Sequence, residues 1–191
     1  LYYQKYDKAV AYATRVLGAN PATTLRDWKA FYALSPNGDI APNAYINTQN
    51  TANLFLQTVY SPAGLYLGPY GYAAKYAHGQ LLTETEDMQS DGPWGHSADF
   101  GYTIFSNNSL SKYFINKIPY SFEYNDIQAG TGYPHTEYAV FTTDKTLLVR
   151  AEAYALQGNY AAAVADLNTE VAAMSGGTMS VTLAGIKAFY A

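Results

Sequence analysis

The loop at residues 90–102, with the sequence SDGPWGHSADFGY, contains the side chains best suited to chemistry in this chain. Trp94 lies between Pro93 and Gly95 and is followed closely by His96. Exposed aromatic rings cover the apolar faces of sugars, while neighbouring polar groups bind the hydroxyls. The loop therefore predicts a sugar-binding platform, although a tryptophan that packs the loop onto the core would give the same pattern.

A second group of aromatic side chains lies in the segment 61–76, SPAGLYLGPYGYAAKY. Three glycines and two prolines interrupt this segment, so we expect irregular chain that displays its tyrosines. Tyr70 and Tyr72 are the two that we select. Together with Trp94 and His96 they are our candidate ligand-binding residues, on the argument that they are exposed.

Paired carboxylates suggest a second chemistry, the hydrolysis of glycosides. Glu84 and Asp87 are three residues apart and would share one face of a helix. A hydrolase needs two carboxylates that flank the substrate from separate elements, so Glu123 or Asp126 would have to supply the second. A solvated acidic face is the preferred interpretation. His96 has no second histidine at ligand spacing, so no metal or cofactor is predicted.

Composition excludes several classes of partner and of binding site. The chain has 191 residues, which predicts one domain or part of one. Its net charge is −4, with no basic run, which argues against nucleic acid as a partner. It has no cysteine, which excludes disulfides and thiolate metal sites. The 20 tyrosines and the charged fraction of only 14% favour a surface that binds polar, uncharged ligands.

The element that we expect to organise the chain is a helical hairpin at residues 145–174. Apolar residues recur there at helical spacing, and Gly158 interrupts them at a position suited to a tight turn. Arg150 stands where a tetratricopeptide repeat usually has leucine. The repeat pattern is otherwise matched at four positions, Ala151, Tyr154, Ala163 and Leu167.

Other segments are assigned from the same signals. Thr24 is predicted to cap the second of three further helices, at 1–20, 25–34 and 182–191. Aromatic spacing in the second helix predicts that Trp28 packs in the core. Segment 51–60 is compatible with a helical turn or a strand, and 107–126 with loop and short strand-like pieces.

These assignments predict a mainly all-α fold, built from tetratricopeptide-like helical hairpins with a long, irregular, loop-rich insert. We expect a single domain over 1–191, or part of one larger domain. Its helical scaffold would be 1–35 and 144–191, and the irregular ligand-side region would be 36–143.

Three stretches carry a resemblance to a known family: YYQKYDKAVAYATRVL, NNSLSKYFINKIPYSFEYND and DKTLLVRAEAYALQGNYAAAVADLN. They resemble the SusD/RagB family of outer-membrane nutrient-binding lipoproteins of Bacteroidetes, and the chain looks like an internal fragment of a member. The family usually has arginine after the hairpin's Leu-Asn. Here Leu167-Asn168 is followed by Thr169-Glu170, which points to a divergent subfamily.

The resemblance implies a non-enzymatic protein on the extracellular face of the outer membrane. Its lipid anchor would lie outside this chain. Such a protein captures glycans or peptides and delivers them to a SusC-like, TonB-dependent transporter. The helical repeats would face the transporter and 36–143 would carry the ligand site.

Two other hypotheses stay open. A helical-repeat adaptor would bind a protein or peptide in its concave face, with Trp94 buried and 36–143 as core cover. A glycoside hydrolase would place two carboxylates about 5–10 Å apart in a cleft. We favour the surface glycan-binding protein over both.

Overall fold

The computed structural model describes most of the chain outside its central third. The described residues are 1, 3–34, 40–61, 78–79, 105–107, 112–114 and 121–191.

Helices lie mainly at the two ends of the sequence and strands lie between them. The helices are α1 (Tyr6–Leu17), the 3-10 turn η1 (Pro21–Thr23), α2 (Trp28–Tyr32), α3 (Ile40–Tyr45), α6 (Thr143–Leu156), α7 (Tyr160–Ser175) and α8 (Leu183–Phe189). The strands are β1 (Asn53–Tyr60), β2 (His78–Gly79), β3 (Phe105–Asn107), β4 (Lys112–Phe114), β5 (Ser121–Asp126) and β6 (Thr131–Thr142).

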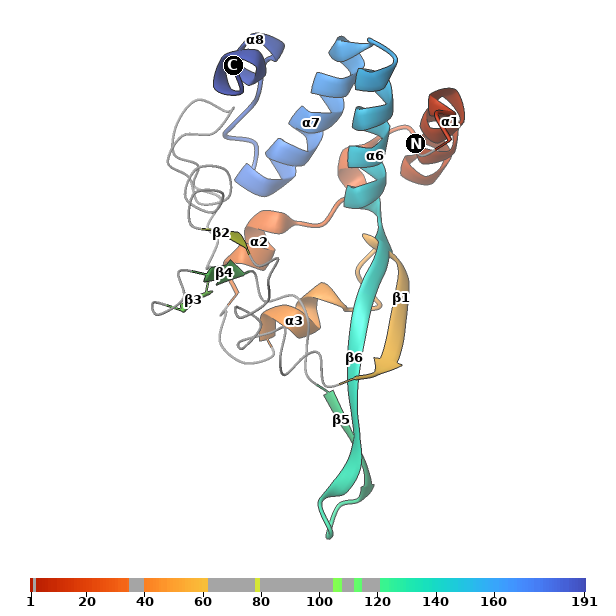
Figure 1. Cartoon of the computed structure of the whole chain (residues 1–191), viewed down its shortest axis with the longest axis vertical. Helices are drawn as coiled ribbons and strands as arrows, with labels where there is room; N and C mark the ends of the chain where they lie inside the picture. The colour runs from red at the N-terminus through yellow and green to blue at the C-terminus, as the bar shows by residue number, and fades with distance from the viewer. Residues whose placement is uncertain (2, 35–39, 62–77, 80–104, 108–111, 115–120) are drawn as a thin grey trace.

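The predicted helical hairpin is confirmed as α6 and α7. Helix α6 begins where Thr142 Oγ1 accepts a hydrogen bond from Lys145 N at 3.1 Å. The turn between the helices contains Gly158 at φ +77°, a backbone conformation that glycine adopts without a Cβ penalty. Asn159 then caps α7 by accepting from Ala162 N. Helix α1 lies beside α6, so three helices pack together (Figure 1).

An ion pair inside this helical layer lies at the position where the predicted repeat pattern has leucine. Arg150 Nε and Nη2 donate to the two carboxylate oxygens of Asp166 at 2.8 and 2.7 Å, which joins α6 to α7. Nη1 also donates to Thr14 Oγ1 at 3.2 Å, which ties in α1. The hydrogen bond to Asp166 raises the pKa of Arg150. The pair therefore fixes three helices at one buried point.

Two apolar clusters form the described core. One joins α1 to α6 through Leu17 and Leu147, which are almost fully buried. The other is aromatic and contains Trp28, which confirms its predicted place in the core. Helix α2 differs from prediction at its start: Asp27, not Thr24, is its cap, accepting from Ala30 N at 2.9 Å.

The prediction of a mainly all-α fold is wrong, because the described residues have a mixed α/β structure. A three-stranded antiparallel sheet has the order β1-β6-β5, and β2, β4 and β3 form a smaller one. The region 36–143 is thus not wholly irregular, and α3 also lies in it. Segment 51–60 contains β1, and the strand-like pieces predicted in 107–126 include β4 and β5. Their assembly into sheets was not predicted, because burial along β1 does not alternate with period two. Gly132 and Pro134 also make β6 resemble a turn.

Strand β6 connects the helical layer to the far end of the molecule. It runs directly into α6, and with β5 it forms a hairpin that projects away from the helices (Figure 1). Asp126 fixes the hairpin turn by accepting from the backbone N–H groups of Gln128 and Ala129. The sheet is therefore anchored at one end by α6 and solvated at the other.

The close approach of the two hairpin strands requires glycine at position 132. A Cβ added there would overlap the carbonyl oxygen of Glu123 on the paired strand. We expect Gly132→Ala to force β5 and β6 apart and to cost about 1–3 kcal/mol of stability, as overpacking does. Chemical denaturation measures the loss. Thr131→Ala, at an exposed neighbouring position, should change stability by less than about 0.5 kcal/mol. Equal stability of the two variants would contradict the overlap.

Candidate ligand-binding face of the sheet

All four of the predicted site residues lie outside the described residues: Trp94, Tyr70, Tyr72 and His96. The same holds for the acidic pair Glu84 and Asp87. The candidate site below is therefore built from other residues. It lies within the region 36–143 that we expected to carry the ligand.

Four side chains gather on one face of the sheet, Tyr60 from β1, Tyr133 and His135 from β6, and Glu123 from β5. The ring of Tyr60 lies 4.9 Å from that of His135 and 5.8 Å from that of Tyr133, measured between centroids. His135 Nε2 lies 3.0 Å from Glu123 Oε2. We call these four residues the aromatic face.

Strand register brings these residues together. Tyr60 pairs with His135 across β1 and β6, and Glu123 pairs with Tyr133 across β5 and β6. Tyr133 and His135 are two residues apart, so both point to the same side of the sheet. His135 is the point where all three strands meet, because it also pairs with Ser121.

The aromatic face is open to solvent. Tyr60 is 74% exposed and Tyr133 is 53% exposed. Their two rings meet edge to face, at an interplanar angle of 71°, so they form an angled surface and not a single flat one. The phenol hydroxyls, the imidazole and the carboxylate supply both donors and acceptors around it. This combination of exposed rings and polar groups suits a neutral ligand that is rich in hydroxyls.

Of these residues, only Glu123 was considered from the sequence, as a hydrolase carboxylate. Gly130, Gly132 and Pro134 give the segment that contains Tyr133 and His135 the composition of a turn. A usable signal was the alternation of Tyr133, His135 and Glu137, which is the spacing of one strand face. The sequence gives no sign that Tyr60 lies beside them, because its partner in β6, His135, is 75 positions away in the chain.

The two carboxylates that the hydrolase hypothesis named in the described residues, Glu123 and Asp126, already have partners. Asp126 accepts two backbone N–H groups in the hairpin turn. Glu123 lies against His135. Within the described ranges, no three His, Cys, Asp or Glu side chains come together as metal ligands do.

A second polar cluster is enclosed within the fold and has a structural role. Arg26 is 2% exposed, and its Nη2 donates to the Asn53 side chain at 2.7 Å and to the Tyr45 carbonyl at 3.0 Å. Asp144 Oδ1 accepts from Trp28 Nε1 at 2.9 Å and from Arg26 N at 3.1 Å. The Arg26 guanidinium also lies 4.3 Å from the centre of the Tyr45 ring.

Burial dominates the electrostatics of this cluster. It lowers the pKa of Arg26, an effect that Tyr45 and Asp144 oppose, and it raises the pKa of the Tyr45 phenol. Because these groups are closed off from solvent, we regard the cluster as the joint between α2, α3, β1 and α6.

No family model, no curated protein and no solved structure matches this chain. None of the helices in the described part of the chain combines the length and the apolar character that crossing a bilayer requires.

Proposed function

We propose that this chain binds a neutral oligosaccharide, or a similar polar nutrient oligomer, and delivers it to a TonB-dependent transporter at the outer face of an outer membrane. The observation that supports ligand binding most directly is the aromatic face, where two exposed tyrosines lie beside His135 and Glu123. Tyrosine rings and polar groups in this arrangement are suited to the two sides of a sugar ring.

The ligand is proposed to be neutral for an electrostatic reason. Glu123 is exposed and would repel an anionic ligand, while His135 Nε2 already lies against that carboxylate. The hydroxyls of a neutral sugar can donate to Glu123 and accept from the tyrosines without bringing a charge. The low charged fraction of the chain fits the same class of ligand.

Delivery to a transporter is supported by the resemblance in α1 and in the α6–α7 hairpin. The β5–β6 hairpin projects away from the helices, which is compatible with separate surfaces for ligand and transporter (Figure 1). In the proposed arrangement the helical layer faces the transporter, the sheet carries the ligand, and no bond in the ligand is broken.

The test is a glycan array on the wild-type chain, followed by titration calorimetry with the best glycan. We expect Tyr60→Ala and Tyr133→Ala each to weaken binding about tenfold or more, equivalent to about 1.4 kcal/mol. Tyr124→Ala is the matched control: Tyr124 is also exposed, but its ring contacts Phe122 on the opposite face of the hairpin. It should leave affinity within about twofold.

Three other results of this experiment would contradict the proposed site or the proposed function. Binding that survives both substitutions in folded variants would remove the aromatic face as the site and return attention to Trp94. A wild-type chain that binds no glycan would contradict the proposal and favour peptide capture or the adaptor hypothesis. Cleavage of the glycan during titration would instead favour the hydrolase hypothesis.

A further inference from the structure

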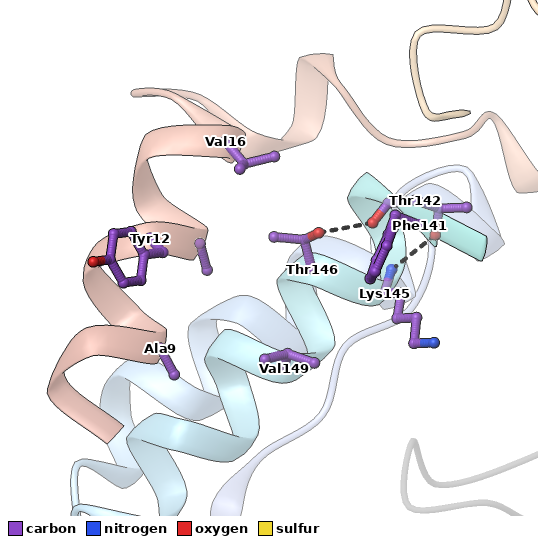
Figure 2. A pocket seen from close by; sticks show the side chains of 9 residues that line it. Ala9, Tyr12, Val16, Phe141, Thr142, Lys145, Thr146 and Val149 are labelled. Carbon is purple, nitrogen blue, oxygen red and sulfur yellow. Dashed lines mark hydrogen bonds between the residues drawn. The ribbon is translucent and has the colours of Figure 1, made fainter. Parts of the chain in front are cut away.

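A second surface, remote from the aromatic face, lies between α1 and α6. It is a groove with a volume of about 300 Å³. Figure 2 shows Ala9, Tyr12 and Val16 on one wall, Val149 and Thr146 on the other, and Phe141 at the end. Tyr12, Val16 and Phe141 are all exposed, at 61%, 46% and 56%.

The polar atoms at the end of the groove already have partners. Thr146 Oγ1 donates to the Thr142 carbonyl at 2.8 Å, and Thr142 Oγ1 accepts from Lys145 N at 3.1 Å (Figure 2). Because both hydroxyls are already hydrogen-bonded within the chain, the groove presents mainly apolar atoms to a bound molecule. Phe55 extends the apolar surface onto β1, with its ring centre 6.2 Å from that of Phe141.

Positive charge borders this groove although the whole chain has a net charge of −4. Arg15 lies over the Tyr12 ring, 5.6 Å from its centre. Lys8 is four residues before Tyr12 and therefore shares its side of α1, and Lys145 lies at the start of α6. Asp7 is five residues before Tyr12, on the other side of α1. On α6 the exposed acidic residue is Glu152, two turns beyond Lys145, whereas Asp144 is buried.

We propose that this groove binds an amphipathic helix of a partner protein. That helix presents two large apolar side chains at i, i+3 or i, i+4 spacing to the groove and carries acidic residues along its flank. Docking of an apolar helix face between two helices is a recurring recognition mode. The small side chains of Ala9 and Ala13 leave room for the apolar anchors. The positive charges of α1 and Lys145 attract the acidic residues along the flank of the partner helix.

The groove proposal does not depend on glycan binding. The two surfaces share no residue. Both include residues of β6, but Phe141 and Thr142 lie at the opposite end of that strand from Tyr133 and His135, so each surface can be altered while the other serves as an internal control. A variant of the groove should retain glycan binding, and a variant of the aromatic face should retain helix binding. Failure of one proposal is thereby distinguished from failure of the other.

The test begins with a displayed library of 18-residue, alanine-based helical peptides whose apolar and charged positions are randomised. The full chain is the target, and Val16→Glu is used for counter-selection. We expect enrichment of peptides with paired apolar anchors and flanking Glu or Asp. In fluorescence anisotropy with the enriched peptide, Val16→Glu should weaken affinity at least tenfold and Lys145→Glu about threefold to tenfold. Replacing the peptide's Glu with Lys should restore binding to Lys145→Glu.

Tyr160→Glu is the control, because Tyr160 is exposed on α7 and lies outside the groove. It should bind the peptide as the wild type does. Circular dichroism confirms that every variant is folded. Enrichment of basic or extended peptides, or of none, would overturn the proposal. So would wild-type self-association in sedimentation that Val16→Glu abolishes, because the occupant would then be a second copy of this chain.

Discussion

Replacing Asp144 with alanine is expected to destabilise the chain by about 3–5 kcal/mol, the usual cost of leaving a buried charge without its partner. Asp144 is 4% exposed and lies in the first turn of α6. Its Oδ1 accepts from the Trp28 indole and from the backbone of Arg26. The substitution removes both hydrogen bonds together with the negative charge that interacts with the Arg26 guanidinium.

Two further variants separate charge from hydrogen bonding. Asp144→Asn keeps an oxygen acceptor and loses only the charge, so we expect a smaller loss of about 1–3 kcal/mol. Arg26→Met combined with Asp144→Ala should recover part of the stability lost in the single variant, because no buried guanidinium then lacks a counter-charge. Urea denaturation gives all three values. A loss below about 1 kcal/mol for Asp144→Ala would contradict the structural role of the cluster.

The helical part of this fold, apart from α3, could be predicted because its signals are local. Apolar spacing placed α1, α6 and α7, and the turn at Gly158 needed only a glycine and its flanking residues. Thr142 caps α6 and Thr182 caps α8, and each accepts a hydrogen bond from the backbone N–H group three residues later. Helical hydrogen bonds join residues four apart, so most of what defines these elements lies within one short window.

The sheet could not be predicted because what stabilises it is distant in sequence. Strand β1 pairs with β6 across 75 or more positions, and neither strand has one buried and one exposed face. Pro134 is tolerated in the central strand because it lies just beyond the last pair with β1, where its carbonyl accepts from Ser61 N at 3.0 Å. Local sequence there predicts a turn, and tertiary pairing overrides it.

The candidate site also combines features that are local in the sequence with features that depend on distant contacts. The sequence predicted a site of aromatic rings beside a histidine, and the aromatic face combines the same kinds of residue, but the four predicted residues lie outside the described part of the chain. The particular set depends on register, because a shift of one residue in β6 would send Tyr133 and His135 to the other face. The buried Arg26 cluster was likewise invisible, since it joins residues more than 100 positions apart.

The buried pair of Arg150 and Asp166 should behave differently when one partner or both are replaced. Asp166→Ala alone leaves the guanidinium buried without its carboxylate, and we expect a loss of about 3–5 kcal/mol. Arg150→Leu with Asp166→Leu replaces both desolvated charges with apolar side chains. We expect the free energy of unfolding of the double variant to lie within about 1–2 kcal/mol of the wild-type value, because apolar packing often replaces a buried ion pair without loss of stability.

A double-mutant cycle measured by urea denaturation tests this, with Arg150→Leu and Asp166→Leu as its two single variants. Glu152→Leu is a control for adding leucine to α6, because Glu152 is exposed and should change stability by less than about 0.5 kcal/mol. A double variant as unstable as Asp166→Ala would mean that the pair itself stabilises the hairpin. Recovery would instead mean that the pair mainly fixes geometry, because three of its hydrogen bonds set how α6 meets α7 and α1.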